Sequence, residues 1–330
     1  MKILKINVPP ITLMTHHAAV FSIITNNDSY IPWVISNYLQ LFRDRYTTDF
    51  YIHQHTLVTC PWLECSPLTL NEMRNGNLIK ILTELIDKNS YIYAVVEAYH
   101  ISSYRFSYQK FSFPHPLFFY GYDNEKRIFY VADFFYEGKY SYSTASYDEI
   151  HRSINCEFDF WTKGGIILNY LPNINYSFNI ENIKTSLKDY LYSNNKSKLY
   201  RPYQYFEASD SVYGLNLSIE IAKDIELLDD DKVLDIRPMA MLVEHKKVLL
   251  LLNDYLYKNN YLSHNFNSKL KPLYEQTLLI RNLLLKYSIK KDKDLIKRAT
   301  NQLISLVEEE RTIIEMILDN IKVLGPGQAT

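Results

Sequence analysis

His115 and Asp133 are the two side chains whose types and spacing best fit a catalytic pair. His115 precedes the aromatic run PLFFYGYD, and Asp133 lies near the end of a second run, RIFYVADFF, after the polar turn DNEK. This turn predicts a β-hairpin, which brings the two residues to the same side of a sheet. A histidine oriented by a carboxylate is a general base with a fixed tautomer. The structural alternative is a loop histidine before Pro116 and an aspartate that caps a turn.

The pattern around this hairpin predicts an α+β fold. Two helices are expected at residues 16–26 and 29–46, after a short strand within 2–10. A further helix is expected at the end of 66–88. Buried or alternating strands follow at 91–101, 116–123, 127–135 and 164–172, with a strand and a short helix within 137–154.

The remainder of the chain has helical periodicity. Helices are expected at residues 179–193, 214–228, 238–258, 270–291 and 292–324, and Pro238 occupies the favoured first position of the third. We therefore expect a domain over residues 1–172, in which helices precede an antiparallel sheet, and an all-α domain over residues 173–330.

Composition narrows the class of protein. Hydrophobic residues make up 47% and charged residues 22%, which is typical of a globular chain. The net charge of −1 argues against a nucleic-acid surface. Three cysteines argue against a disulfide-rich scaffold, and we find neither a signal peptide nor an apolar run of membrane-spanning length. We therefore expect a soluble cytoplasmic protein.

The segment HPLFFYGYDNEKRIFYVADFF, with YIYAVVEAYHI before it, resembles the His-to-Asp region of the C39 peptidase-like fold. More narrowly, it resembles the butirosin-biosynthesis-protein-H-like family of nonribosomal peptide and related natural-product gene clusters. The resemblance covers most of residues 1–172 and, in outline, the helical remainder. It implies a papain-like acyltransferase that moves an acyl or aminoacyl group from a carrier-protein thioester to an amine. His115 would be its base and Asp133 the orienter.

The resemblance also implies the partners of the protein. They are an acyl or peptidyl carrier protein and a small-molecule amine, with phosphopantetheine present only as part of the donor. No other cofactor, nucleic acid or membrane is expected.

The chain departs from the family at the nucleophile. The family has a cysteine at the start of the first helix, where the sequence here reads LMTHHAAVFS, with Thr15, His16 and His17. A relocated candidate is Cys60, since Pro61 after it is favoured at the first position of a helix and a helix N-cap lowers a thiol pKa. The alternative is that Cys60 is a small buried hydrophobic residue.

Three functions therefore stay open. The first is an acyltransferase that uses Cys60, or that has no covalent step. The second is a catalytically degenerate family member that binds a carrier protein or a pathway intermediate. The third is a cysteine protease, which the missing N-terminal cysteine disfavours.

Several other polar residues are candidates for substrate binding. Glu97, within an apolar strand, and Tyr99 are expected to line the cleft or, alternatively, to lie on an exposed edge strand. His16 and His17 are the remaining candidates. These histidines, with His53 and His55, have no ligand spacing typical of a metal site, so none is expected.

Two charge-rich helical segments and one leucine run are interpreted structurally. The segments EHKK (residues 244–247) and EEER (308–311) are expected to be solvated helix faces. The run VLLLL (248–252) is expected to be core or a homodimer contact.

Overall fold

The computed structural model describes residues 1–27, 29–44, 47–51, 56–136, 138–160, 163–196, 211–228 and 233–322. The chain divides into two compact units. The first, which we call the sheet unit, comprises Met1–Asp28 and Gln54–Asn175. The second, the helical unit, comprises Ser29–His53 and Tyr176–Thr330. Residues 29–53, which the sequence analysis assigned to the N-terminal domain, are thus grouped with the C-terminal helices.

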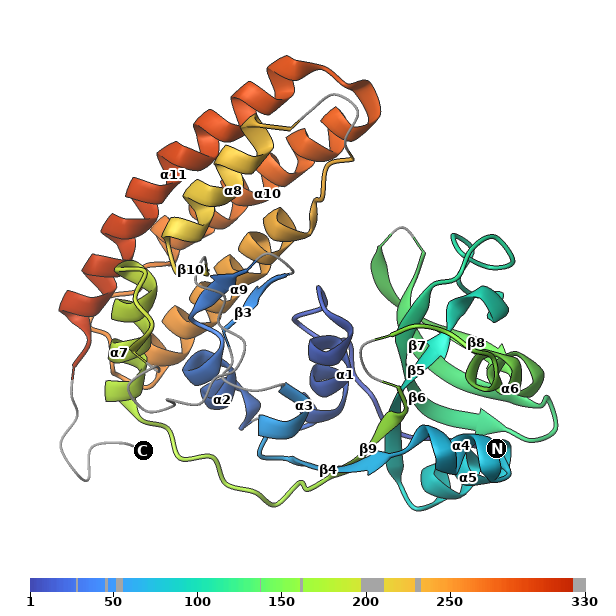
Figure 1. Ribbon diagram of the computed structural model, residues 1–330. Coiled ribbons are helices and arrows are strands. Elements are labelled where there is room, and N and C mark those ends of the chain that lie inside the picture. Colours follow the sequence, from blue (N-terminus) through green and yellow to red (C-terminus); the bar gives the residue numbers. More distant parts are fainter. Residues whose placement is uncertain are drawn as a thin grey trace. The chain divides into compact units, whose positions relative to one another are not determined.

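The sheet unit contains a seven-stranded sheet with the order β4-β9-β5-β6-β7-β8, in which β1 also pairs with β6 (Figure 1). Every pairing is antiparallel. The predicted combination of an antiparallel sheet with a helical C-terminal region is confirmed. The strands are Lys2–Ile3 (β1), Leu63–Leu68 (β4), Ser90–Glu97 (β5), Pro114–Asp123 (β6), Ile128–Tyr136 (β7), Lys139–Ser146 (β8) and Gly165–Tyr170 (β9).

Helices cover both faces of this sheet. Helix α1 lies on one side, and α5 and α6 lie on the other (Figure 1). Side-chain hydrogen bonds cap the N-termini of two later helices. Asn77 caps α5, and Ser146 forms a capping box with Glu149 at α6. The helices of this unit are Thr15–Ile24 (α1), Thr56–Thr59 (α3), Leu70–Asn75 (α4), Leu78–Asp87 (α5), the 3-10 helix Ala98–His100 (η1) and Tyr147–Asn155 (α6).

The strand register decides which side chains share a face. In β5 and β6, Val96 pairs with His115 and Tyr93 pairs with Phe118. Because successive side chains of a strand point to opposite faces, His115 and Tyr93 lie on opposite faces of the sheet. The face of His115 is apolar away from that residue, with Ile92, Ala94, Val96, Leu117, Phe119, Phe129 and Val131 all buried.

The helical unit has long helices and a small three-stranded sheet of order β10-β2-β3. Its helices are Tyr30–Asn37 (α2), Ile180–Leu191 (α7), Asn216–Glu226 (α8), Arg237–Lys258 (α9), Asn267–Lys290 (α10) and Lys293–Asn320 (α11). Its strands are Leu41–Arg43 (β2), Thr48–Phe50 (β3) and Val212–Tyr213 (β10).

One predicted helix was wrong in its extent. We expected a helix over residues 29–46, but α2 ends at Asn37 and the chain continues as the strand β2. Leu41 and Phe42 instead make strand pairs with Phe50 and Asp49 of β3, a non-local contact that helical spacing does not reveal.

Long apolar stripes hold the helical unit together. Val248, Leu249 and Leu252 of α9 are buried, so the VLLLL run contributes to the core of the unit. Within the part of the chain that the structure describes, no helix combines the length and the apolar character needed to span a bilayer.

Candidate functional site

His115 and Asp133 are in direct contact in the sheet unit. The Nδ1 atom of His115 lies 2.6 Å from Oδ2 of Asp133. Asp133 stands one residue beyond the pair that Phe118 forms with Ala132, so it faces β6 two residues away from His115, on the same side of the sheet. The side chain of His115 is 24% exposed, whereas that of Asp133 is 0% exposed. The predicted hairpin thus brings together a buried carboxylate and a partly accessible imidazole.

A third residue, Tyr104, completes this cluster. Its hydroxyl donates a short hydrogen bond to Oδ2 of Asp133, the same oxygen that His115 contacts. Tyr104 is buried and lies in the connection between β5 and β6, four residues beyond η1. Oδ1 of Asp133 is also buried and has no hydrogen-bond partner among the described residues. Oδ2 of Asp133 therefore contacts both Tyr104 and His115.

Aromatic packing fixes the orientation of the imidazole. The ring of Phe113 stacks on that of His115, with centroids 5.0 Å apart and an interplanar angle of 18°. Tyr104 meets the same ring edge-on, at 6.3 Å between centroids. With Nδ1 bound to Asp133, Nε2 is the nitrogen through which His115 can exchange a proton with a substrate.

The electrostatics of the cluster favour the protonated imidazole. Burial disfavours the charged ring, but the negative charge of Asp133 and its hydrogen bond outweigh burial and raise the pKa of His115 above its ordinary value of 6.5. In the neutral ring, the contact with Asp133 assigns the proton to Nδ1 and leaves Nε2 as the basic site. The arrangement is chemically suited to general acid–base catalysis at a pH near neutral.

Glu97 is a buried carboxylate that accepts hydrogen bonds from the segment after β5. Its carboxylate accepts hydrogen bonds from the backbone N–H groups of Tyr99 and Phe113, at 3.0 and 2.7 Å, and from the hydroxyl of Ser112. Glu97 is 4% exposed and lies on β5, between β9 and β6. The exposed edge-strand alternative was therefore wrong. By holding both ends of the 98–113 connection, Glu97 positions the segment that carries Tyr104 and Phe113.

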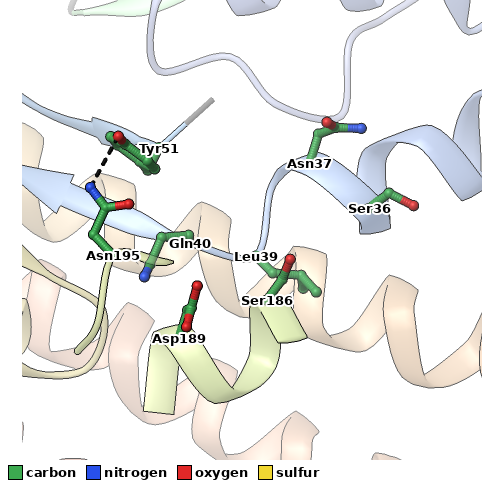
Figure 2. Close-up of a pocket in the computed structure, with 8 residues that line it drawn as sticks. All are labelled: Ser36, Asn37, Leu39, Gln40, Tyr51, Ser186, Asp189 and Asn195. Atoms are coloured by element: carbon green, nitrogen blue, oxygen red, sulfur yellow. Dashed lines mark hydrogen bonds between the residues drawn. The ribbon is translucent and has the colours of Figure 1, made fainter. Parts of the chain in front are cut away.

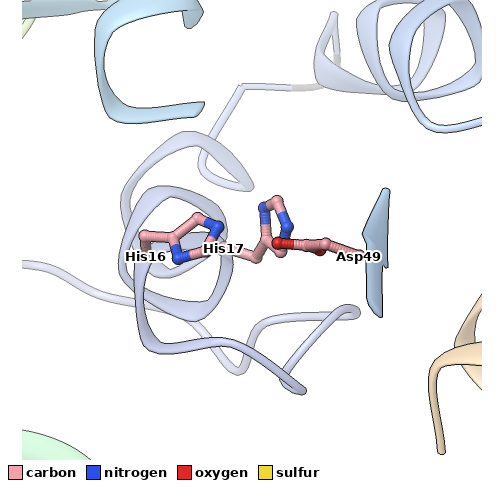
Figure 3. A group of neighbouring side chains, drawn as sticks. All are labelled: His16, His17 and Asp49. Carbon is pink, nitrogen blue, oxygen red and sulfur yellow. The ribbon is translucent and has the colours of Figure 1, made fainter. Parts of the chain in front are cut away.

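The two histidines at the start of α1 have contacts of their own. Figure 3 shows His16 and His17 side by side on this helix, with ring centroids 4.1 Å apart. His17 is buried, and its Nδ1 lies 3.0 Å from the hydroxyl of Thr56. The hydroxyl of Thr15 lies 2.6 Å from that of Tyr93, which belongs to the sheet face opposite His115. Burial and the nearby charge of Asp133 raise the pKa of Tyr93, so the start of α1 contacts a residue within electrostatic reach of Asp133.

Cys60 does not occupy the helix N-cap that the sequence suggested. It follows α3, and its backbone N–H donates to the carbonyl of Thr56, so it terminates a helical turn. The side chain is 2% exposed, and burial raises the pKa of its thiol to about 12. It leads into β4, which β9 and β5 separate from β6. The N-cap placement of Cys60 was therefore wrong, whereas the alternative of a small buried residue is confirmed. The thiol lacks the properties of an activated nucleophile.

Comparison with known proteins gives this chain no relative: no protein-family model and no curated protein sequence matches it. The site must therefore be interpreted from its own geometry. Sequence reasoning found His115 and Asp133 but missed Tyr104 and Phe113. Phe113 stands two residues before His115, and this spacing along a strand was the available signal for their shared face.

The helical unit contains a second cluster of ionisable side chains. Lys246 of α9 lies 2.6 Å from Glu310 of α11, and the hydroxyl of Tyr190 donates to the same Glu310 oxygen at 2.8 Å. His245 stacks on Tyr190, and its Nε2 lies 2.8 Å from the carbonyl oxygen of Leu39.

This cluster is sealed from solvent, since His245, Lys246 and Glu310 are at most 3% exposed. The interpretation of EHKK and EEER as fully solvated faces was therefore wrong. A side chain one position away, such as the exposed Lys247, does face water. A run of charged residues in a helix does not by itself indicate which of these side chains is buried.

Proposed function

We propose that the sheet unit is an acyltransferase of the C39 peptidase-like type, in which His115 acts as the general base and Asp133 orients it. The donor would be an acyl or aminoacyl thioester on a carrier protein, and the acceptor a small-molecule amine. The observation that supports this proposal is the accessible imidazole whose Nδ1 lies 2.6 Å from a fully buried carboxylate. The class of donor and acceptor comes from the family resemblance of residues 115–135.

The proposed reaction has no covalent enzyme intermediate. The neutral amine attacks the thioester carbonyl, and a carbon–nitrogen bond forms. Nε2 of His115 takes the proton that the amine loses, and Asp133 stabilises the resulting imidazolium. The carbon–sulfur bond then breaks, and the proton passes from His115 to the departing pantetheine thiolate. The products are an amide and a free thiol, and the enzyme returns to its starting state.

The positions of the alternative nucleophiles favour this direct attack. Cys60 is buried with a strongly raised pKa, so little of it exists as thiolate near neutral pH. In the described parts of the chain, the hydroxyl of Thr15 contacts Tyr93, and no hydrogen bond joins it to His115. Among the described residues, no hydrogen bond or ion pair joins a cysteine to His115. The base has a partner that orients it but no neighbouring thiol to activate.

The proposal is tested by measuring amide formation from an acyl-pantetheine thioester and a panel of amines by mass spectrometry. His115→Ala is expected to lower the rate about 100- to 10,000-fold, because general-base catalysis contributes rate factors of that size. The matched control is His151→Ala, which removes an exposed histidine of α6 in the same unit and should leave turnover unchanged. Cys60→Ser should also retain turnover if the protein remains folded.

The pH dependence adds a second arm to this test. Only the neutral imidazole can accept a proton, so the rate should fall as the pH falls through the raised pKa of His115, above pH 6.5. Turnover that survives in His115→Ala would contradict the proposal. A requirement for Cys60 would contradict the version without a covalent intermediate.

A second candidate function is a carrier-protein or intermediate binder that has lost catalysis. The observation that favours it is the first helix, where Thr15 stands at the family's cysteine position and its hydroxyl is engaged with Tyr93. If this function is correct, the wild-type protein forms no amide with any thioester of the panel. Binding to an acylated carrier protein, measured by calorimetry, would be retained in His115→Ala.

A further inference from the structure

The helical unit contains a small polar cavity between α2, β3, α7 and the segment that follows α7. Figure 2 shows its lining, in which Asp189 and Ser186 project from one face of α7 towards Gln40. Its volume is about 70 Å³. A cavity must offer roughly 10–15 Å³ to hold one water, so this one has room for several waters or for a small polar group.

Asp189 is the charged side chain in this lining, and its carboxylate is poorly partnered. Oδ2 accepts one long hydrogen bond, from the backbone N–H of Lys196 at 3.3 Å. Oδ1 is buried and has no hydrogen-bond partner among the described residues, and the ammonium group of Lys196 is 3.8 Å away. The side chain of Asp189 is 13% exposed, but its Oδ1 atom is closed to solvent, so this oxygen carries a desolvation cost.

This environment also affects the acidity of the carboxyl group. Burial is the largest influence on the Asp189 carboxyl and raises its pKa above the ordinary value of 3.8, in spite of the opposing contacts with Lys196. A cation placed beside the carboxylate would reverse this effect.

Neutral hydroxyl groups stand next to the carboxylate. Ser186 precedes Asp189 by three residues, which places the two side chains on the same face of the helix. The hydroxyl of Tyr51, on the other side of the cavity, accepts a hydrogen bond from the side-chain amide of Asn195 at 3.0 Å. Hydroxyl oxygens accept hydrogen bonds. The cavity is therefore lined by one negatively charged carboxylate and by neutral hydrogen-bond acceptors.

We propose that this cavity binds the primary ammonium group of a small amine, with Asp189 as its counter-ion and Ser186 as a second acceptor. A primary ammonium group offers three N–H donors around a compact charge. A carboxylate and hydroxyls within a narrow space match that set. The ammonium of Lys196, which is 48% exposed, competes for Oδ1 of Asp189 from outside.

The test is a titration of the full-length protein with ethylammonium chloride, followed by calorimetry and by amide chemical shifts. Sodium and tetramethylammonium chlorides at equal ionic strength serve as probes without N–H donors. We expect saturable binding of ethylammonium, with shift changes at residues 186 and 189, and no saturable binding of the other two cations. Equal responses to all three salts, or no saturable response to ethylammonium, would overturn the proposal.

Variants separate the cavity from a general effect of charge. Asp189→Asn should weaken ethylammonium binding about tenfold or more, as expected for the loss of a hydrogen bond to a charged group. Ser186→Val, which fills the space and leaves the carboxylate intact, should also weaken binding and provides a second variant if Asp189→Asn does not fold. Lys196→Gln should tighten binding because it removes the competing cation.

The matched control is Glu181→Gln, which neutralises an exposed carboxylate in the first turn of the same helix. It should bind as the wild type does. Binding that is unchanged in both Asp189→Asn and Ser186→Val would exclude this cavity as the site. None of these measurements depends on the acyltransferase activity proposed for His115.

Discussion

Each unit contains a carboxylate that shares one oxygen between a tyrosine and a base, and the two clusters differ in the identity of the base and in access to solvent. In the sheet unit, Asp133 shares one oxygen between Tyr104 and His115. In the helical unit, Glu310 shares one oxygen between Tyr190 and Lys246. His115 is 24% exposed, whereas Lys246 and Glu310 are each 3% exposed.

The pKa values of the two bases shift in opposite directions. In the sheet unit, burial lowers the pKa of His115, but the charge of Asp133 and its hydrogen bond together outweigh burial and raise that pKa. In the sealed cluster, burial prevails over Glu310 and lowers the pKa of Lys246, and burial together with Lys246 lowers the pKa of His245. A base–carboxylate pair is thus a candidate for proton transfer in the first unit and a packing element in the second.

The largest effect is expected from breaking the sealed pair. Glu310→Ala leaves the Lys246 ammonium buried without its carboxylate, which costs about 3–5 kcal/mol in the free energy of unfolding. The measurement is urea unfolding followed by the helical circular-dichroism signal. Glu309→Ala, which removes the exposed neighbour on α11, should change this free energy by at most about 0.5 kcal/mol. Equal losses in both variants would mean that the buried pair is not structural.

A smaller effect is expected from Tyr104→Phe in the other cluster. Phenylalanine keeps the packing against Phe135 but removes the hydrogen bond to Asp133, which is worth about 1.5–3 kcal/mol when the acceptor is charged. Without this donor, Oδ2 of Asp133 should hold the His115 proton more strongly. The pKa of His115 should therefore rise further, and the acid limb of any pH–rate profile should move with it.

Tyr136→Phe is the control for this prediction, since Tyr136 is 52% exposed on β7. It should change neither the unfolding free energy nor the pKa of His115. A Tyr104→Phe variant with an unaltered pKa of His115 would show that Tyr104 acts only in packing.

The sequence was sufficient to predict the contact of His115 with Asp133 because that contact is local. The turn DNEK joins adjacent strands, and an antiparallel hairpin brings the two residues together without help from the rest of the fold. The helical C-terminal region was equally accessible, since its stripes repeat with the period of a helix.

The features that were missed depend on distant contacts. Tyr104 reaches Asp133 from a connection with no periodic pattern, and Glu310 meets Lys246 across 64 residues of chain. The placement of Cys60 was missed because Pro61 after it favours the start of a helix. In the structure, Cys60 instead follows the last residue of the short helix α3. Local propensity specifies neither which charged residue of a run turns inward nor which face of the sheet a helix covers.

The most direct test of the central claim is a pH titration of the two histidines by NMR, with His115→Gln and His245→Gln used to assign their ring signals. We predict that His115 titrates with a pKa above 6.5 and that His245 remains neutral well below that pH. This result would indicate that His115 is an accessible base held by Asp133 and that His245 is a buried residue with a role in packing. A pKa of His115 at or below 6.5, or the same titration for both rings, would contradict the distinction between the two clusters.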